Sequence, residues 1–188
     1  MPTFERPSLV VDGANLVADV TDAWNSLVGS HRLAALAPAA VGEPLHRAVE
    51  NGDAYALYEA MLQRARARFR VAVDVRAVTA THATRYELTA VPRGFAGDVE
   101  VALRPLHDRR RWTMPLFDPE APRRHESVRV CDFCQRVLGF SWVEPDIALR
   151  HLELDGTSRQ PRMRSDVCDD CERIVYHAAG ASRLGLAS

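Results

Sequence analysis

Four cysteines carry the clearest chemistry in this sequence. They form two Cys-x-x-Cys pairs, Cys131 with Cys134 and Cys168 with Cys171, and 33 residues separate the pairs. Two residues between thiolates let both sulfur atoms turn to one point on a tight loop, and two such loops supply four soft ligands at tetrahedral corners. The spacing predicts a metal site. We expect structural Zn²⁺, because four protein ligands leave no open position for a substrate.

The 33 residues between the two pairs exceed the roughly 15–20 residues of common zinc-ribbon spacings. We therefore expect the inner segment to fold as a small structure of its own. Three histidines, His125, His151 and His177, could replace one cysteine, although four thiolates suffice without them. An iron–sulfur cluster, a dithiol redox switch and a set of small buried thiols stay open as alternatives to zinc.

The cysteine-containing segment, residues 130–175, reads VCDFCQRVLGFSWVEPDIALRHLELDGTSRQPRMRSDVCDDCERIV. It resembles the short tail module of some bacterial two-component sensor proteins, and the matching residues are Cys131, Cys134, Arg136, Trp142, Cys168 and Cys171. The resemblance implies a helix-like middle piece over residues 142–154. The chain departs from the module at SDVCDDC, which lacks the His and the Pro that the module carries around its second pair.

The chain that must position these cysteines has 188 residues and is 47% hydrophobic, enough for a substantial core. All its basic residues are Arg and its net charge is −1, so the whole molecule has no strong field for nucleic acid or membranes. The start, MPTFERPSLVVDG, shows no signal-peptide pattern, and no run of about 18 apolar residues predicts a membrane span. We expect a cytoplasmic protein, in which reduced thiols favour metal binding over disulfides.

The first hundred residues alternate between short strands and helices. An apolar run ends at Gly13 and Asn15, which suit a tight turn, and Asp53 is a plausible N-cap for the clearest helix. Strands and helices segregated in this order predict an α+β fold with an antiparallel sheet. The expected elements are strands at 8–12 and 16–20, a short helix at 22–28, helical turns within 34–49, a helix at 53–68, and strands around 69–77, 86–90 and 99–103.

This order resembles a PAS domain over residues 7–106. The matching text is PSLVVDGANLVADVTDAWNSLVG for the opening hairpin and first short helix, VGEPLHRAV for the next turn, YALYEAMLQRARAR for the long connecting helix, and RYELTAVPRG and DVEVALRPL for the last two strands. The resemblance implies an antiparallel five-stranded sheet with helices on one face. It also implies a pocket for a ligand or partner and a tendency to form homodimers.

Several PAS cofactors are excluded by the residues present. A flavin–cysteinyl adduct or a thioester-linked chromophore needs a cysteine, and the region before Cys131 has none. The helix expected at 53–68 has no histidine for haem, and His31, His46 and His82 fall in expected loops or turns. The ligand of the expected pocket stays unidentified.

These patterns divide the chain into three parts. Residues 1–106 are the PAS-like sensory domain, and residues 107–127, rich in Arg and Pro, are expected to be a linker. Residues 128–188 form the four-Cys zinc module, which ends in a helix at about Asp169–Ala179. We therefore expect a non-catalytic signalling or regulatory protein with a signalling protein as its partner and no membrane contact.

Two other functions stay open. A nucleic-acid-binding regulator would use the zinc module and residues 107–127, which we call the Arg-rich strap. Within the strap, Trp112 beside Arg109, Arg110 and Arg111 could stack on a base. The acidic residues Asp132, Asp169 and Asp170 argue against direct phosphate contact at the cysteines themselves.

The second alternative is a metal-dependent nuclease, because LVVDGAN also resembles the start of PIN/NYN-type nucleases. That resemblance implies Asp12 as a cation ligand. Such a site needs further carboxylates at later strand ends, and only Asp98 is near one. No P-loop or Gly-x-Ser-x-Gly pattern is present, so the sequence predicts no enzyme.

Overall fold

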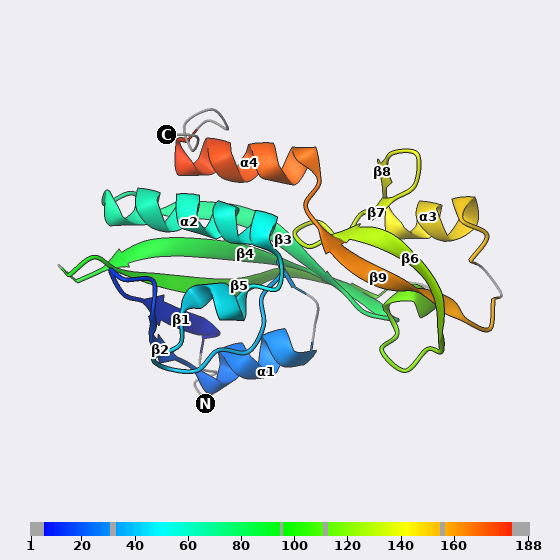
Figure 1. The fold of residues 1–188 in the computed structure, drawn as a ribbon, viewed down its shortest axis with the longest axis horizontal. Helices are drawn as coiled ribbons and strands as arrows, with labels where there is room; N and C mark the ends of the chain where they lie inside the picture. Colours follow the sequence, from blue (N-terminus) through cyan, green and yellow to red (C-terminus); the bar gives the residue numbers. More distant parts are fainter. Residues whose placement is uncertain (1–5, 31–32, 95, 111–112, 155–156, 182–188) are drawn as a thin grey trace.

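The computed structural model describes residues 6–30, 33–94, 96–110, 113–154 and 157–181, and Figure 1 shows their fold. The elements are β1 (Ser8–Val11), β2 (Val17–Val20), α1 (Asp22–Ser30), η1 (Leu45–Ala48), α2 (Gly52–Arg66), β3 (Val71–Val78), β4 (His82–Arg93), β5 (Asp98–Arg110), η2 (Pro115–Phe117), β6 (Arg123–Cys131), β7 (Val137–Leu138), β8 (Trp142–Val143), α3 (Pro145–His151), β9 (Gln160–Asp166) and α4 (Asp169–Ala179).

The first five strands form one antiparallel sheet in the order β2-β1-β5-β4-β3, which confirms the predicted α+β class and five-stranded sheet. The register places Val73 opposite Leu88 and Val101 opposite Ala90, so the apolar positions of neighbouring strands fall on one face. β4 and β5 are longer than expected, because polar residues at one end of each strand also pair.

The helices cover that apolar face of the first sheet. Trp24 of α1 and Leu57 of α2 share a buried core with the inward residues of β3, β4 and β5. Large side chains fill the layer between helices and sheet; those with less than 2% exposure include Trp24, Tyr58, Met61, Leu88 and Leu103. This arrangement agrees with the helices on one face that the PAS resemblance implies.

The long helix α2 begins earlier than the sequence suggested. Its N-cap is Asn51, whose side chain accepts a hydrogen bond from the backbone N–H of Asp53 at 2.8 Å, so Asp53 lies in the first turn and is not the cap. The helix ends at Arg66. The guanidinium of Arg66 donates hydrogen bonds to the carbonyl oxygens of Gly97 and Asp12, and these bonds tie two hairpin turns to α2.

The last strands form a second, smaller sheet in the order β8-β7-β6-β9, in which β6 and β9 are parallel. The stretch 107–127, which we expected to be a linker, is built into the two sheets at both of its ends. Its first residues continue β5 and its last residues begin β6. Between them Leu116 and Phe117 are buried in a second core, which the density of Pro and Arg had obscured. Arg111 and Trp112 lie outside the described residues.

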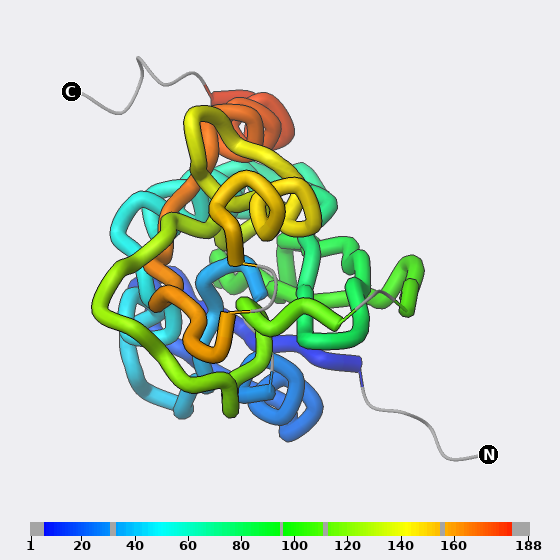
Figure 2. Tube along the Cα trace, turned by 90° about the vertical axis from the view of Figure 1, so that its right-hand side faces the viewer, coloured from blue at the N-terminus to red at the C-terminus, as the bar shows by residue number. Residues whose placement is uncertain are grey.

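The C-terminal helix α4 has the predicted bounds but packs on the first region. It lies alongside α2 in both views (Figures 1 and 2), and Val175 and Tyr176 join the main core. Helix α4 ends at Ala179 and is capped by Gly180, whose φ of 65° is a left-handed conformation that glycine adopts without strain. None of the described helices has the length and apolar character needed to cross a membrane.

Candidate metal centre

The parallel pairing of β6 and β9 brings the two cysteine pairs together. Cys131, the last residue of β6, is in register with Asp166, the last residue of β9, and Cys168 follows two residues later as the N-cap of α4. Parallel neighbours need a crossover connection of a dozen or more residues. The crossover here contains β7, β8 and α3. This explains the 33-residue gap and confirms that the inner segment has its own structure.

A tight loop shapes the first cysteine pair. The carbonyl oxygen of Cys131 accepts a hydrogen bond from the N–H of Gln135 at 2.8 Å, and the N–H of Cys131 donates to the oxygen of Arg136 at 2.8 Å. Gln135 takes a left-handed φ of 61° to close the turn. The chain is therefore reversed within a few residues, and Cys134 is turned back toward Cys131.

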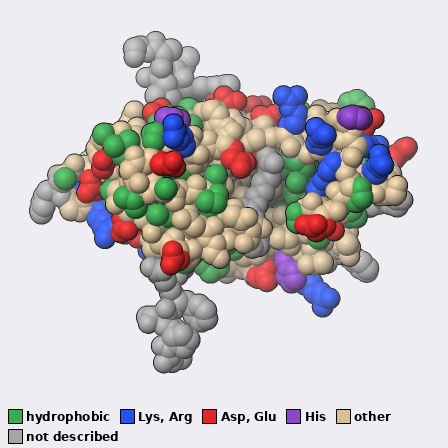
Figure 3. All heavy atoms as spheres, turned by 60° about the horizontal axis from the view of Figure 1, so that its bottom comes forward, with side chains coloured by type: hydrophobic (Ala, Val, Ile, Leu, Met, Phe, Trp, Pro, Cys, Tyr) green, Lys and Arg blue, Asp and Glu red, His purple; other side chains and the backbone are tan. Residues whose placement is uncertain are grey.

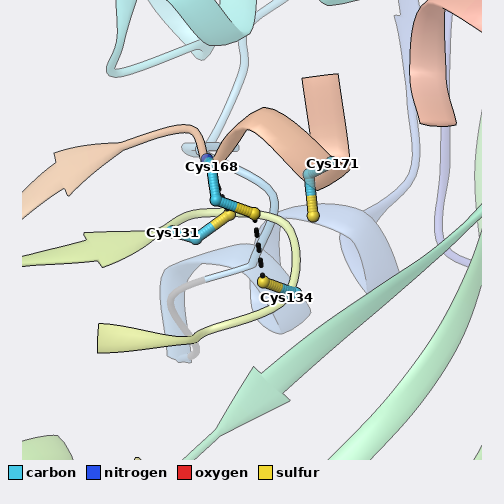
Figure 4. Close-up of side chains that lie close together, drawn as sticks. All are labelled: Cys131, Cys134, Cys168 and Cys171. Carbon is cyan, nitrogen blue, oxygen red and sulfur yellow. Dashed lines mark hydrogen bonds between the residues drawn. The ribbon is translucent and has the colours of Figure 1, made fainter. Parts of the chain in front are cut away.

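The four sulfur atoms lie within 4.8 Å of one another and converge on one point (Figure 4). The Sγ atoms of Cys134 and Cys168 are 3.7 Å apart, too far for a disulfide. A tetrahedron of sulfurs about 2.3 Å from a central Zn²⁺ has edges of about 3.8 Å, so the separation fits a single metal ion. Cys131, Cys168 and Cys171 are buried, and Cys134 is half-buried.

The protonation pattern of the four thiols also favours a cation. Hydrogen bonding with Cys134 lowers the pKa of Cys131, and hydrogen bonding with Cys131 and Cys134 lowers the pKa of Cys168. Contacts with Cys131 raise the pKa values of Cys134 and Cys171. The pKa values of the four thiols are driven in opposite directions, because four negative sulfurs this close would repel one another. A divalent cation can take the place of the thiol protons and hold all four as thiolates.

Paired charges surround the cysteines. Arg136, which follows the first pair, donates to Asp170 of α4 at 2.9 Å and lies 3.5 Å from Glu144 at the start of α3. Glu144 also pairs with Arg76 of β3 at 2.5 Å. The hydrogen bond to Asp170 raises the pKa of Arg136. This network links the first cysteine loop to α4, to α3 and to the first sheet.

Asp132, which was expected with Asp169 and Asp170 to place negative charge around the cysteines, is turned inward. Its side chain is fully buried and accepts hydrogen bonds from Asn51 Nδ2 at 3.3 Å and from the Ser165 hydroxyl. Its carbonyl oxygen accepts from the N–H of Ala34 at 2.8 Å. The carboxylate therefore joins the N-cap of α2 to β9. Asp169 and Asp170, the two carboxylates between Cys168 and Cys171, remain at least partly exposed.

Phe133, between the first two cysteines, docks the loop on the first region. Its carbonyl oxygen accepts a hydrogen bond from the N–H of Arg76 on the edge strand β3 at 2.7 Å. Its buried ring lies 6.0 Å from the ring of Tyr58 in α2. Burial raises the pKa of Tyr58 well above its usual value, with a smaller contribution from Asp132. Sequence reasoning missed this contact, although an apolar residue inside a Cys-x-x-Cys loop was the signal available.

The other candidate ligands lie elsewhere. His125, His151 and His177 are exposed, and the four cysteines are the only group of three or more close metal-ligating side chains among the described residues. His46 and His82 are also exposed, and His31 falls outside the described residues.

Asp12 does not stand as a free cation ligand at the end of its strand. Its Oδ1 accepts hydrogen bonds from the N–H groups of Ala14 and Leu16, each at 2.8 Å, and so closes the β1–β2 hairpin. The aspartate is therefore accounted for by the turn, as the hairpin interpretation of the sequence expected.

Comparisons with protein-family models, with curated proteins and with solved structures find no match for this chain. The PAS-like and two-component-like resemblances therefore rest on the residues quoted above.

Proposed function

We propose that this chain is a non-catalytic regulatory protein of the signalling type, in which a PAS-like interaction domain is joined to a second sheet by a structural Zn²⁺. The observation that carries the proposal is the position of the cysteines. The Cys131–Cys134 loop touches the first region through Phe133 and Asp132, while α4, which begins at the other pair, packs on α2.

The metal would act as a clasp between two parts of one signalling unit. Four thiolates would hold the end of β6 and the start of α4 at a fixed distance, with no ligand position left for a reaction. Zinc binding in small modules contributes about 10 kcal/mol to folding, enough to hold a small sheet in place. A shift of α2 or β3 would therefore be passed to β9 and α4 through the clasp.

The first region supports interaction with a protein more than capture of a large cofactor. Its element order is the one that the PAS resemblance implies, and its sheet is antiparallel. The layer between α2 and the sheet is filled by Tyr58, Met61 and Leu88. We propose a signalling protein as the partner, with homodimer formation through the PAS-like region as the arrangement to test.

The clasp is tested by elemental analysis and absorbance of the purified full chain. We expect about one zinc per chain, no visible colour, and loss of the zinc in Cys168→Ser. Iron together with labile sulfide would show that the cysteines hold an iron–sulfur cluster and not zinc. Full zinc content in Cys168→Ser would show that Cys168 is not a ligand.

The interaction role is tested by native mass spectrometry and light scattering on the same sample. A mass equal to the chain plus zinc, or twice that mass, supports a protein-interaction module. An organic molecule that stays bound under native conditions and leaves on denaturation would contradict it and make the domain a ligand sensor.

A further inference from the structure

The two faces of the second sheet differ in chemistry. The β6–β9 register pairs Ser127 with Arg162 and Arg129 with Arg164, and these four exposed residues share one face. The intervening residues Val128, Val130 and Met163 face the second core.

The exposed face is rich in unpaired positive charge. Residues 123–130 and 157–166 contain six arginines and two carboxylates, whereas the whole chain has a net charge of −1. Arg123 and Arg124 are half-buried, and the guanidinium of Arg123 donates to backbone carbonyl oxygens, so the exposed arginines are Arg129, Arg159, Arg162 and Arg164. Glu126 lies 3.5 Å from Arg124, and Asp166 lies 3.1 Å from Arg129. Of the described residues, none forms an ion pair with the guanidinium groups of the other exposed arginines of these two segments, Arg159, Arg162 and Arg164.

The space-filling view shows arginine side chains gathered at the end of the molecule that carries the second sheet (Figure 3). Beside the sheet, a hollow of about 530 Å³ is lined by three arginines, one histidine, one carboxylate and two hydroxyl residues: Arg123, Arg124, Arg159, His125, Glu126, Thr157 and Ser158. A face that is merely solvated usually mixes both signs of charge. Here the positive sign dominates along two neighbouring strands.

The spacing of these side chains suits a chain of phosphates. Residues two apart on a strand are about 6.7 Å apart, and neighbouring strands are about 4.8 Å apart. Arg162 and Arg164 therefore stand in line along β9, with Arg129 beside them on β6. Arginine binds phosphate through two parallel hydrogen bonds and stacks on bases, so a row of arginines can follow a sugar–phosphate backbone.

An apolar groove adjoins this row and can receive bases. It has a volume of about 710 Å³ and lies between β6, the β7–β8 turn and α3. Ser127, Val128 and Arg129 of β6 line the groove on one side and Leu138 and Leu152 on the other, so the groove meets the arginine row at Arg129. Phe140, also in the lining, is 112% exposed, so its ring is open to stacking. Base stacking on an aromatic ring beside a basic track is typical of single-strand recognition.

We infer that the exposed face of β6 and β9 binds single-stranded nucleic acid, with Arg162, Arg164 and Arg129 on the phosphates and Phe140 stacked on a base. This inference goes beyond the regulatory function proposed above and does not depend on the PAS-like region. It also replaces the strap as the contact surface, because the row lies on the strands of the second sheet.

The test uses the zinc-loaded full chain and fluorescein-labelled oligouridine and oligothymidine, with anisotropy measured at several salt concentrations. We expect binding at low salt that weakens steadily as salt rises. Arg162→Glu with Arg164→Glu should weaken binding by about tenfold or more, because two phosphate contacts become repulsive. Phe140→Ala should weaken binding by about fivefold or more through lost stacking.

The matched control is Arg47→Glu with Arg93→Glu, the same change of charge on exposed arginines of the first region. It should bind like the unchanged protein, and zinc content should be equal in all variants. No binding at low salt, or equal losses in control and test variants, would overturn the inference. So would equal or tighter binding of duplex DNA, of anionic phospholipid vesicles or of polyglutamate, each of which assigns the face to another class of partner.

Discussion

The two sheets of this protein reach stability by different routes. The first is wholly antiparallel, is formed by consecutive hairpins and one long-range pair, and is covered by α1, α2 and α4 over a large core. The second depends on a parallel pair, β6 and β9, whose own core is small and borrows Val78 and Ala83 from the first sheet. A core of the first size can fold by burial of apolar surface alone, whereas the second requires a further constraint.

In the function proposed above, a metal held by the four cysteines supplies that constraint at the point where the two regions meet. Cys131 and Cys168 sit at the ends of the parallel strands, and Phe133 and Asp132 reach from the same loop into the first region. The contrast between the sheets therefore predicts that damage at the cysteines acts mainly on the second sheet. Damage at the loop contacts should act on both.

Loss of the metal should have the largest effect. In Cys168→Ser, or after a strong chelator, we expect β6, β7, β9 and α3 to lose protection against hydrogen exchange. This loss is expected because zinc sites contribute about 10 kcal/mol to such modules. β3, β4 and β5 should keep their protection, because they are held by the large core of the first region. Hydrogen exchange read by mass spectrometry measures both sheets at once. Equal loss of protection in the two sheets would show that they form one cooperative unit.

Phe133→Ala comes next. The buried ring packs against Tyr58, and its removal should cost about 3–5 kcal/mol in the free energy of unfolding. Denaturant unfolding gives this value. The same substitution at Phe140, whose ring is 112% exposed, should change stability by less than about 0.5 kcal/mol. Similar values at the two positions would mean that the loop does not dock on α2 as described.

Asp132→Asn should cost about 1–3 kcal/mol, because an amide N–H₂ would face the donors of Asn51 and Ser165 without matching both. The expected signature is a joint loss of hydrogen-exchange protection at the start of α2 and along β9. Glu120→Gln, an exposed carboxylate outside the contact, serves as the control. An unchanged free energy of unfolding in Asp132→Asn would show that this carboxylate does not stabilise the contact between the N-cap of α2 and β9.

Tyr58→Phe should have the smallest effect, about 1 kcal/mol, through loss of the 2.8 Å hydrogen bond from Tyr58 to the Ala34 oxygen. The pH dependence of the free energy of unfolding tests the role of Tyr58 more directly. Because the pKa of folded Tyr58 is raised, the unfolded chain loses this proton first, so stability is complete below about pH 10 and falls above it. Tyr58→Phe should show a shallower fall, and Tyr55→Phe, on a less buried ring, a change closer to zero. Identical slopes in all three proteins would contradict the assignment to Tyr58.

Much of the first region could be predicted from local pattern. Alternation of apolar and polar residues placed β3, β4 and β5, and the apolar run before Gly13 placed β1. The cap of α2 was misplaced by two residues, since Asn51 and Asp53 are both good caps and the pattern does not separate them. Residues 107–127 were misjudged because Pro and Arg dominate their composition, while the few apolar residues that decide their burial, Leu116 and Phe117, are sparse.

By itself the sequence determined that the chain carries two pairs of candidate metal ligands. Residue type and the spacing within each Cys-x-x-Cys pair are local properties that fix what each loop can bind. Only the tertiary structure decided that the two loops meet. A parallel pair of strands joins residues far apart in the chain, and no local pattern encodes that register. The structure also decided that Asp132 faces inward and that the arginines of β9 line one exposed face, since both depend on what packs on the other side of the sheet.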